Sequence, residues 1–333
     1  MSKKVLIIGG GVAGLEASGV LSKLGFFVTI VEASDHVGGK LNRWANLFPS
    51  RRPASDVLNH LKYQLDPNTT IITNSKIYDI NINKSTVSAS LSGGENIEAD
   101  AVLISTGFEL FDARKKEEYG YKIYENVITS ADLEKIIKEG NGIKTSRGKT
   151  PQRIGIVHCV GSRDEKAGNT YCSKVCCVTG VKQAIELKEQ LPSSEIFNFY
   201  MDLRMYDRYF EDLYKEAQVK HHVQFIRGRL SEAFENPDGT VMIKIEDTLL
   251  GKPMKMNLDL LVLLIGMTGT SVLKEKLGLH TASDGFYLPV DEHLYSTSSN
   301  QQGIFYAGAC TGPKQLKTLL QRPEPQRWKL QDT

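Results

Sequence analysis

The sequence has no long hydrophobic run and no marked excess of charge of either sign. Its longest mostly apolar stretch, Leu258–Met267, is far shorter than the roughly 20 residues that span a bilayer. The apolar run Val5–Ile8 stops at a glycine, whereas a secretory signal needs about 7–15 apolar residues. Lys and Arg number 41 against 39 Asp and Glu, which excludes the strongly basic face of a nucleic-acid-binding protein. We therefore expect a cytoplasmic protein without a transmembrane segment or a nucleic-acid partner.

Cysteine is also scarce, with five in 333 residues. The odd number and the expected compartment exclude a framework of structural disulfides. Four of the five lie between residues 159 and 177, and chance rarely gathers a scarce residue so closely. The fifth, Cys310, follows Gly308 and Ala309 and is expected to be a small packed side chain near a cofactor.

The N-terminal residues predict a strand, a turn and a helix. Lys3–Ile8 becomes strongly apolar before three consecutive glycines begin at Gly9, which is typical of a buried strand that ends in a tight turn. Apolar residues at helical spacing predict a helix over Ala13–Leu24. The β-branched and aromatic residues of Phe26–Val31 predict a second strand. The chain thus begins with a βαβ unit.

The turn after the first strand fits the dinucleotide-binding pattern G-x-G-x-x-G. Gly9 permits the tight turn, Gly11 lets a pyrophosphate approach the backbone, and Gly14 lets helix and strand pack closely. The helix N-terminus then presents free N–H groups to the phosphates. Glu32 ends the second strand, where its carboxylate can accept hydrogen bonds from both ribose hydroxyls. The glycines alone would also fit a simple turn, but this context favours a nucleotide site.

Three later segments favour FAD over NAD. Gly38-Gly39 and Lys40-Leu41 come shortly after Glu32, and Thr106-Gly107 and Gly303–Gly308 follow farther along. This order resembles flavoprotein disulfide reductases, although Gly38-Gly39 alone would also fit a flexible loop. A helix starting near Gly312-Pro313 is expected to direct its N-terminus at the flavin. The expected FAD contacts are Gly9, Gly11, Val12, Ala13, Gly14, Glu32, Ala33, Gly39, Lys40, Leu41, Ile77, Thr106, Gly107, Gly308, Ala309 and Lys314.

The rest of the chain predicts a small meander and a second α/β unit. Short alternating runs within Thr69–Glu98, including Ile71-Ile72, predict antiparallel strands. After the polar linker Asn141–Pro151, the strand Arg153–Cys159 begins the second unit. The aromatic side chains near Asp207–Ala217 are expected to pack in a core or, where exposed, to form a subunit interface. The other predicted elements are strands at Ala101–Ser105, Glu195–Met201, Val223–Ile226, Val241–Ile245, Leu258–Ile265 and Gly303–Ala309 and helices at Ala131–Ile137, Thr179–Gln190 and Asp207–Ala217.

The four clustered cysteines have the spacing C-x12-C-x3-C-C. Cys159 ends a predicted strand, and Cys172, Cys176 and Cys177 lie around the following loop and helix start. Four thiolates from one segment can hold a cubane iron–sulfur cluster. Structural zinc prefers two C-x2–4-C knuckles, and a thioredoxin-like site needs C-x-x-C. Zinc, thiol redox chemistry and plain buried thiols nevertheless remain open alternatives.

A second G-x-G-x-x-G, which pyridine-nucleotide disulfide reductases carry in their second domain, is missing. The first strand of the second unit runs instead into His158–Asp164, and Cys159 takes the place of a phosphate-binding glycine. We therefore expect electrons to reach the flavin through a cluster or a protein partner rather than from bound NAD(P)H.

These residues together resemble the flavin-binding (A-type) component of heterodisulfide reductase over nearly the whole chain. The most specific segments are Cys159–Asp164 and Tyr171–Cys177. Further similar segments are Thr106–Asp112, Tyr119–Tyr121, Val127–Ser130, Phe225–Arg229 and Gly312–Lys314. The resemblance implies a thioredoxin-reductase-like α/β protein with two Rossmann-like domains. Its FAD domain is discontinuous, with residues 1–147 and 286–333 around an inserted NAD-domain-like unit of residues 148–285.

The same resemblance implies cofactors and partners. It implies a [4Fe-4S] cluster held by Cys159, Cys172, Cys176 and Cys177, a homodimer of the flavin subunit, and partner subunits of B and C type. The methanogen members of the family carry extra ferredoxin-like cysteine runs and an N-terminal cluster domain, which this sequence lacks. Ser50–Pro53 also stands where some relatives place cysteines.

A short form of this kind resembles the A-type component of the sulfur-oxidising heterodisulfide-reductase-like complex. That complex works with lipoate-binding proteins in the oxidation of sulfane sulfur. The alternatives are the flavin subunit of a quinone-interacting oxidoreductase complex and a stand-alone NAD(P)H-dependent flavoprotein reductase. A redox sensor or assembly scaffold without enzymatic activity is the alternative outside enzymology.

Overall fold

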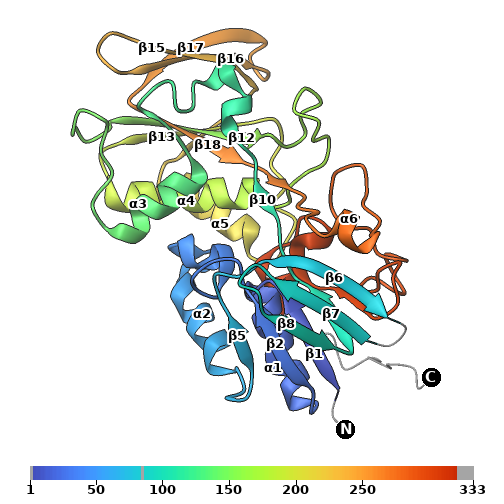
Figure 1. Cartoon of the computed structure of the whole chain (residues 1–333). Coiled ribbons are helices and arrows are strands. Elements are labelled where there is room, and N and C mark those ends of the chain that lie inside the picture. Colours follow the sequence, from blue (N-terminus) through green and yellow to red (C-terminus); the bar gives the residue numbers. More distant parts are fainter. Residues whose placement is uncertain (1–2, 84–85, 321–333) are drawn as a thin grey trace. The chain divides into compact units, whose positions relative to one another are not determined.

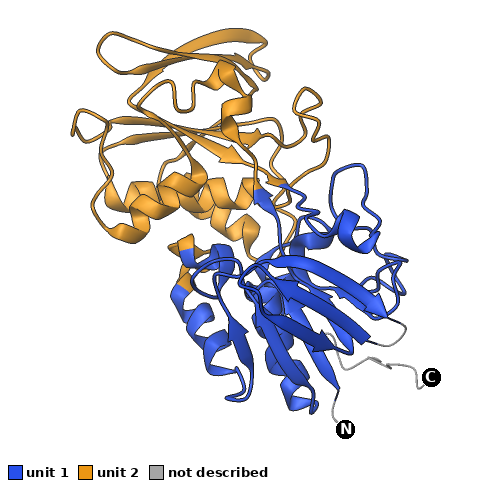
Figure 2. Cartoon of the chain, in the orientation of Figure 1, with its two compact units in different colours: residues 1–42, 55–109, 268–333 blue, residues 43–54, 110–267 orange. Residues whose placement is uncertain are grey.

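The computed structural model describes residues 3–83 and 86–320, which form two compact units (Figure 2). Unit 1 comprises residues 1–42, 55–109 and 268–333, and unit 2 comprises residues 43–54 and 110–267. Each unit is built from α-helices and a parallel β-sheet, as the two halves of the sequence predict (Figure 1). No helix in the described ranges is long and apolar enough to cross a membrane.

Unit 1 is built on a five-stranded parallel sheet in the order β20-β9-β1-β2-β5. Its strands are β1 (Lys4–Ile8), β2 (Phe27–Val31), β5 (Thr70–Ile72), β9 (Ala101–Ile104) and β20 (Ile304–Tyr306). Helix α1 (Val12–Lys23) packs against β1 and β2. β1 and β9 are nearly continuous apolar runs because a parallel sheet is covered on both faces. The predicted βαβ start is confirmed.

A three-stranded antiparallel meander accompanies this sheet. It consists of β6 (Ile77–Asn83), β7 (Thr86–Leu91) and β8 (Asn96–Ala99). The prediction that Ile71-Ile72 belongs to the meander is wrong, because β5 pairs in parallel with β2 and places Ile71 opposite Ile30. A short apolar pair carries no information about its pairing partner, so the sequence pattern could not distinguish the two sheets.

Unit 2 contains a second five-stranded parallel sheet, in the order β11-β18-β12-β13-β14. Its strands are β11 (Val127–Thr129), β12 (Arg153–Val160), β13 (Glu195–Tyr200), β14 (Gln224–Arg227) and β18 (Leu260–Ile265). One face packs against α3 (Ser130–Glu139), α4 (Cys176–Gln190) and α5 (Phe210–Val219). The other face packs against an antiparallel sheet of β15 (Leu230–Glu235), β16 (Val241–Asp247) and β17 (Lys252–Leu258) (Figure 1).

Some element limits differ from the predicted ones. Helix α4 begins at Cys176 rather than Thr179, so two clustered cysteines lie in its first turn. The predicted strand Leu258–Ile265 is divided between the end of β17 and β18. The sequence pattern missed α2 (Ala54–Tyr63), a largely polar helix that buries few side chains. The remaining named elements are β3 (Asn46–Leu47), β4 (Arg52–Pro53), β10 (Glu109–Leu110), β19 (Met267–Thr268), α6 (Lys274–Leu277) and α7 (Leu316–Leu320), with short 3-10 turns at Gly39–Arg43, Ala113–Lys115, Glu117–Tyr119 and Gly308–Thr311.

The chain enters unit 2 twice, through residues 110–267 and through the short segment Arg43–Ala54. We call this short segment the strap. The longer passage agrees in kind with the discontinuous FAD domain that the sequence predicts, although the expected limits of 148–285 stay a prediction. In the strap, the ring of Phe48 lies 5.8 Å from that of Phe210 in α5. No sequence pattern predicted that the strap packs with unit 2.

A buried ion network fixes the strap to unit 2. Lys182 in α4 is 1% exposed, and its ammonium pairs with Glu134 of α3 and with Glu186 at 3.1 Å. It also donates a hydrogen bond to the carbonyl oxygen of Asn46 at 3.1 Å. The Asn46 side chain donates to Glu186 at 2.9 Å, and the N–H of Ala45 donates to Glu134 at 3.1 Å. One ammonium thus faces two buried carboxylates, and burial raises the pKa of Glu186.

Replacing Lys182 by Met is expected to destabilise unit 2, because both carboxylates would remain buried without their cation. Breaking a buried ion pair from one side costs about 3–5 kcal/mol, and urea unfolding would measure the difference from wild type. Lys215→Met, at an exposed position of α5, is the matched control and should change stability by less than about 0.5 kcal/mol. Equal stability of Lys182→Met and wild type would show that the network does not hold the strap.

Candidate functional site

The glycine-rich turn joins β1 to α1 in unit 1. Gly9 has a φ of +107°, and a Cβ added there would lie 2.5 Å from the Ser105 carbonyl oxygen. A Cβ on Gly14 would lie 2.1 Å from the carbonyl oxygen of Gly9, whereas one on Gly11 would meet no atom within 4 Å. Close packing therefore requires Gly9 and Gly14, while Gly11 borders open space of the kind that a pyrophosphate needs.

The N-terminus of α1 begins directly at this turn. Gly11 is the N-cap residue, and no side chain caps the helix. The first turn, which includes Val12 and Ala13, therefore keeps backbone N–H groups available for an anion. These two residues lie where the sequence predicts phosphate contacts.

Glu32 lies just beyond β2 and reaches the same turn. Its carboxylate accepts a hydrogen bond from the N–H of Gly10 at 2.7 Å. It also accepts hydrogen bonds from the Ser34 N–H at 2.9 Å and from the Ser34 hydroxyl at 2.6 Å. Ala33, which follows Glu32, is exposed. The predicted ribose-binding carboxylate is thus fixed beside the predicted phosphate-binding loop.

The segment Gly38–Leu41 lies against the glycine-rich turn. The N–H of Gly38 donates to the Gly10 carbonyl oxygen at 2.7 Å, and a Cβ on Gly39 would lie 3.1 Å from the Gly11 Cα. Lys40 donates to the Phe108 carbonyl oxygen, and its ammonium lies 4.9 Å from the centre of the Phe108 ring. Leu41 is buried. The structure therefore brings the two glycine-rich segments together.

The remaining expected FAD contacts come from the ends of β9 and β20. The Thr106 hydroxyl is buried without a hydrogen-bond partner among the described residues, as expected of a group that a ligand would satisfy. A Cβ on Gly308 would lie 2.6 Å from the Cβ of Ala13, so this segment packs on the first turn of α1. The Lys314 ammonium donates to the Gly308 carbonyl oxygen at 3.0 Å. Together with the open side of Gly11, these groups fit an FAD.

Three further predictions concern Ile77, the helix near Gly312-Pro313 and Cys310. Ile77 begins β6, two residues after Ser75, whose N–H donates to the Glu32 carbonyl oxygen at 3.0 Å. The helix expected near Gly312-Pro313 begins at Leu316. Cys310 is fully buried, and its thiol lies 3.2 Å from the Ala307 carbonyl oxygen. Cys310 is thus the small packed side chain that the sequence predicts.

The four clustered cysteines lie at the carboxyl end of β12 and around the start of α4. Cys159 has a φ of +61° at an irregularity between Val157 and Val160 in the pairing of β12 with β18. Cys176 and Cys177 lie in the first turn of α4 and are buried, whereas Cys172 is partly exposed. A left-handed backbone at a residue other than glycine costs free energy and concentrates at functional sites. The backbone strain therefore coincides with the predicted ligands.

The electrostatics of these thiols favour ligands over nucleophiles. Burial, followed by the neighbouring Cys177, raises the pKa of Cys159 to about 12. Burial raises the pKa of Cys176 well above its usual value, and Cys159, Cys177 and Cys172 raise it further. A reactive thiol needs a lowered pKa, whereas a bound cation stabilises the thiolate form. The four thiols thus lie close enough to influence one another.

The spacing of the thiols does not fit a single zinc ion. With Zn–S bonds of about 2.3 Å, a tetrahedral site holds its sulfurs roughly 3.8 Å apart. Among the described residues, no three cysteine sulfurs lie within 4.8 Å of one another. The one group of potential ligands that does is Glu189, Glu216 and His221, and the guanidinium of Arg51 already forms two hydrogen bonds of 3.0 Å with Glu216 there.

The glycine that follows β12 is closely packed, like Gly9 after β1. Gly161 has a φ of +70°, and a Cβ added there would lie 2.0 Å from the Phe111 ring. His158 is buried, its Nε2 lies 2.8 Å from the Asn198 side-chain oxygen, and burial lowers its pKa to about 4.

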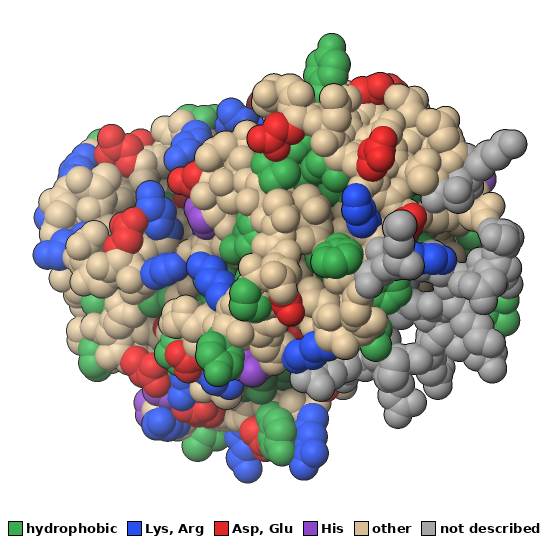
Figure 3. Space-filling view, turned by 60° about the horizontal axis from the view of Figure 1, so that its bottom comes forward, with side chains coloured by type: hydrophobic (Ala, Val, Ile, Leu, Met, Phe, Trp, Pro, Cys, Tyr) green, Lys and Arg blue, Asp and Glu red, His purple; other side chains and the backbone are tan. Residues whose placement is uncertain are grey.

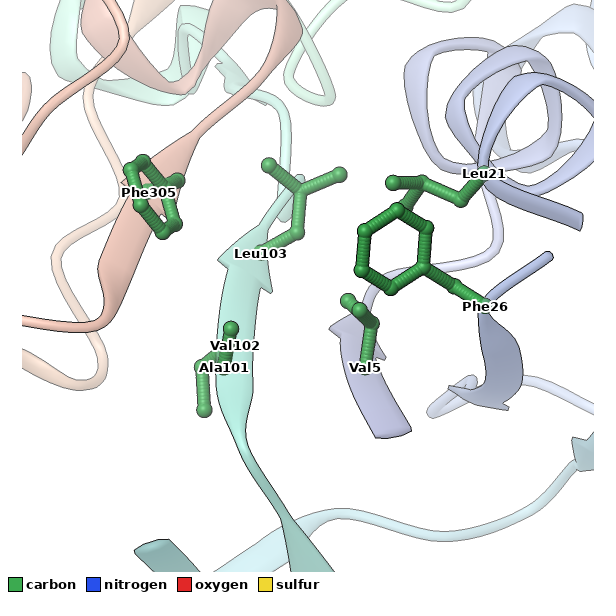
Figure 4. A pocket seen from close by; sticks show the side chains of 7 residues that line it. All are labelled: Val5, Leu21, Phe26, Ala101, Val102, Leu103 and Phe305. Atoms are coloured by element: carbon green, nitrogen blue, oxygen red, sulfur yellow. The ribbon is translucent and has the colours of Figure 1, made fainter. Parts of the chain in front are cut away.

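An apolar hollow and a face of mixed charge are further features of the surface. Figure 4 shows an apolar hollow on the unit 1 sheet, and its lining offers no polar side chain for chemistry. The lining residues are Val5, Leu21, Phe26, Ala101, Val102, Leu103 and Phe305. Figure 3 shows basic and acidic side chains interspersed on one face, as the near-zero net charge predicts.

Sequence reasoning missed three residues that shape these sites. The Ser105 hydroxyl donates to the Gly9 carbonyl oxygen at 2.7 Å, and Ser34 fixes Glu32. Both neighbour predicted contacts in the sequence, so proximity was an available signal. Phe111, which fills the space at Gly161, is 50 residues away in the sequence and offered no such signal.

Comparison with known proteins agrees with this description. The chain matches the model of the pyridine nucleotide-disulphide oxidoreductase family over residues 1–138 and 177–329. The match omits residues 139–176, which include Cys159, Cys172 and Cys176. Thioredoxin reductase of T. acidophilum superposes with a TM-score of 0.65 over 96% of this chain and 95% of its own, at 13% identity. That likeness shows a shared fold of two Rossmann-like domains.

Two curated relatives are A-type components of heterodisulfide reductases. That of the H(2):CoB-CoM heterodisulfide,ferredoxin reductase of Methanothermobacter thermautotrophicus is 40% identical over 66% of this chain and 35% of its own length. An iron-sulfur component of the same type, from the CoB–CoM heterodisulfide reductase of Methanopyrus kandleri, is 31% identical over 95% of this chain and 62% of its own length. The chain thus spans less than two thirds of either relative. It belongs to the pyridine nucleotide-disulphide oxidoreductase family, as an FAD-dependent oxidoreductase homologous to the A-type components of heterodisulfide reductases.

Proposed function

We propose that this chain is the electron-transferring FAD and [4Fe-4S] subunit of a heterodisulfide-reductase-like complex. One observation carries the proposal. Unit 1 keeps an open glycine-rich cradle at Gly11, whereas the corresponding strand end in unit 2 carries Cys159 and leads to a helix whose first turn holds Cys176 and Cys177. A chain with one nucleotide site and four gathered thiols suits electron transfer between a flavin and a metal cluster.

The residues of this chain would bind and tune the two groups. The N-terminus of α1 would hold the FAD phosphates, and Glu32 would accept hydrogen bonds from the ribose hydroxyls. Lys40 and Lys314 would supply positive charge near the flavin. Cys159, Cys172, Cys176 and Cys177 would ligate the cluster. When bound, the flavin supplies one- and two-electron chemistry and the cluster supplies one-electron chemistry.

Hydrogen bonds to the ligand sulfurs would set the potential of the cluster. The N–H of Lys174 lies 3.3 Å from the Cys172 sulfur. Burial raises the pKa of Cys177, and a backbone hydrogen bond from Arg204 acts in the opposite direction. Such bonds stabilise negative charge on sulfur and thereby raise the reduction potential. The chain would thus bind and orient the two redox groups and tune their potentials, and electron transfer between them needs no acid–base pair.

The finer assignment concerns partners and substrate. We propose a homodimer in the cytoplasm that assembles with B- and C-type subunits and takes part in the oxidation of sulfane sulfur, with a lipoate-binding protein as a further partner. The names of the curated relatives support a place in a heterodisulfide reductase complex. The flavin subunit of a quinone-interacting complex is the alternative, and the genes that neighbour this one would distinguish them.

Gly11→Ala is expected to fold normally and to lose FAD affinity, because its Cβ would enter the space reserved for the pyrophosphate. We expect binding to weaken about tenfold or more, which is about 1.4 kcal/mol, as measured by fluorescence titration of the apoprotein. Gly93→Ala is the matched control, since a Cβ there meets only the Ser75 side chain at 3.9 Å. Unchanged affinity in Gly11→Ala would place the nucleotide elsewhere.

Cys176→Ser is expected to abolish the cluster, whereas Cys310→Ser should retain it. Protein prepared without oxygen should contain about four irons and four acid-labile sulfides per chain, measured by chemical assay and absorption spectrum. Cys310 is a suitable control because it is buried in unit 1, outside the clustered set. Flavin bands without iron in the wild type, or zinc alone, would refute the cluster.

NADH at micromolar concentration is expected not to bleach the flavin rapidly, because unit 2 lacks a second G-x-G-x-x-G and carries Cys159 near the end of β12. Anaerobic stopped-flow absorbance would measure the rate, with dithionite as the positive control. Rapid bleaching by NADH would favour a stand-alone nicotinamide-dependent reductase.

A further inference from the structure

One face of unit 2 carries basic and aromatic side chains around the cysteine segment. Its residues come from the loop after β12, from the turn before α4 and from the segment that leads into α5. We call it the arginine–tyrosine face, and its members are Arg163, Lys174, Arg204, Tyr206, Arg208 and Tyr209. Cys172 is the member of the cysteine set that is not fully buried. The predicted cluster therefore comes nearest to solvent at this face.

Short contacts tie this face to the cysteines. The Tyr206 hydroxyl donates to the carbonyl oxygen of Lys174 at 3.3 Å. The Cys177 thiol lies 3.7 Å from the carbonyl oxygen of Asp202, and the Asp202 side chain forms an ion pair with Arg163. A protein docked on these side chains would thus lie close to the cysteines that are predicted to ligate the cluster.

The face carries more positive than negative charge. Its four cations face two carboxylates, Asp202 and Asp207. Asp202 is shared, because Arg204 lies 3.7 Å from the oxygen that also pairs with Arg163. Asp207 accepts the backbone N–H of Arg208 at 2.7 Å. The next acids, Glu211-Asp212, lie in the first turn of α5, where the helix N-terminus offsets their charge.

Exposed aromatic rings accompany the cations. Tyr206 and Tyr209 are 60% and 56% exposed, whereas Phe210 is buried. Core packing thus holds for Phe210, and the alternative for exposed rings, an interface, stays a prediction for the two tyrosines. The Arg208 guanidinium lies 4.8 Å from the centre of the Tyr209 ring. Tyr209 also has a φ of +70°, a conformation that a tyrosine adopts only where its surroundings impose it. Exposed Tyr and Arg side chains are typical of the centre of protein interfaces.

We propose that the arginine–tyrosine face docks an acidic electron-carrier protein. The positive charge selects a partner with a negative rim, and the two tyrosines supply contact area. The proposal rests on the proposed function, because the carrier is to exchange electrons with the cluster. In that exchange one electron passes from the reduced carrier to this chain, so the carrier is oxidised and the chain reduced by one electron. No bond forms or breaks.

The test compares charge reversal on this face with charge reversal elsewhere. The probe is an acidic plant-type [2Fe–2S] ferredoxin, and surface plasmon resonance measures its dissociation constant at low and high salt. We expect Arg204→Glu/Arg208→Glu to weaken binding tenfold or more at low salt and to flatten the salt dependence. Lys252→Glu/Lys255→Glu, on exposed positions of β17, is the matched control and should bind like wild type.

Iron content and visible spectrum are recorded for each protein, so that docking and cluster are judged separately. Salt-sensitive binding to wild type and to the β17 control, lost in Arg204→Glu/Arg208→Glu with iron retained, supports the proposal. Absence of binding to wild type overturns it, and so does unchanged affinity in Arg204→Glu/Arg208→Glu. If that variant binds normally but loses iron, the arginines serve the cluster and docking is refuted. If the wild-type chain contains no iron but still binds the ferredoxin in a charge-dependent way, the predicted cluster is refuted and the docking surface is supported.

Discussion

The close approach of α1 to the end of β1 is the contact on which the nucleotide site depends. Only a residue without a side chain fits at Gly14, where a Cβ would lie 2.1 Å from the Gly9 carbonyl oxygen. The hydroxyl of Ser105 donates to that same oxygen and thereby joins β9 to the turn. Glu32 and Thr106 then converge on the helix N-terminus from β2 and β9. A parallel sheet gathers such side chains because the carboxyl ends of its strands meet at one edge.

Unit 2 uses the same strand-end geometry for different chemistry. Where unit 1 has an open glycine-rich turn, unit 2 has Cys159 at a positive φ, one residue before the end of β12. Burial and mutual repulsion make the clustered thiols poor nucleophiles, because their pKa values rise. The same burial is compatible with ligation, since a cation compensates the thiolate charge. One fold thus presents a nucleotide cradle at one strand end and a set of thiols at the other.

In the sequence, the strap directly follows a segment of the predicted FAD site, and it packs in the unit that carries the clustered cysteines. It follows directly after Gly38–Leu41, and it is held to unit 2 by the buried network around Lys182. Lys182 lies on the helix whose first turn carries Cys176 and Cys177. Desolvation makes such a network costly unless its members are paired, and here the Lys182 ammonium pairs with both carboxylates. The arginine–tyrosine face lies beside the first turn of the same helix, where Asp202 meets the Cys177 thiol.

The sequence by itself determined the local features of this protein. The spacing of Gly9, Gly11 and Gly14, the acid at Glu32 and the missing second fingerprint all follow from residue types at fixed distances, because turns and strand ends are short-range structures. Tertiary structure decided the rest. The parallel pairing of β5, the closure of Gly161 by Phe111 and the exposure of Tyr206 and Tyr209 all depend on residues that are distant in the sequence or on the packing around them. Periodicity does not encode long-range pairing and burial, because only the folded chain brings such residues together.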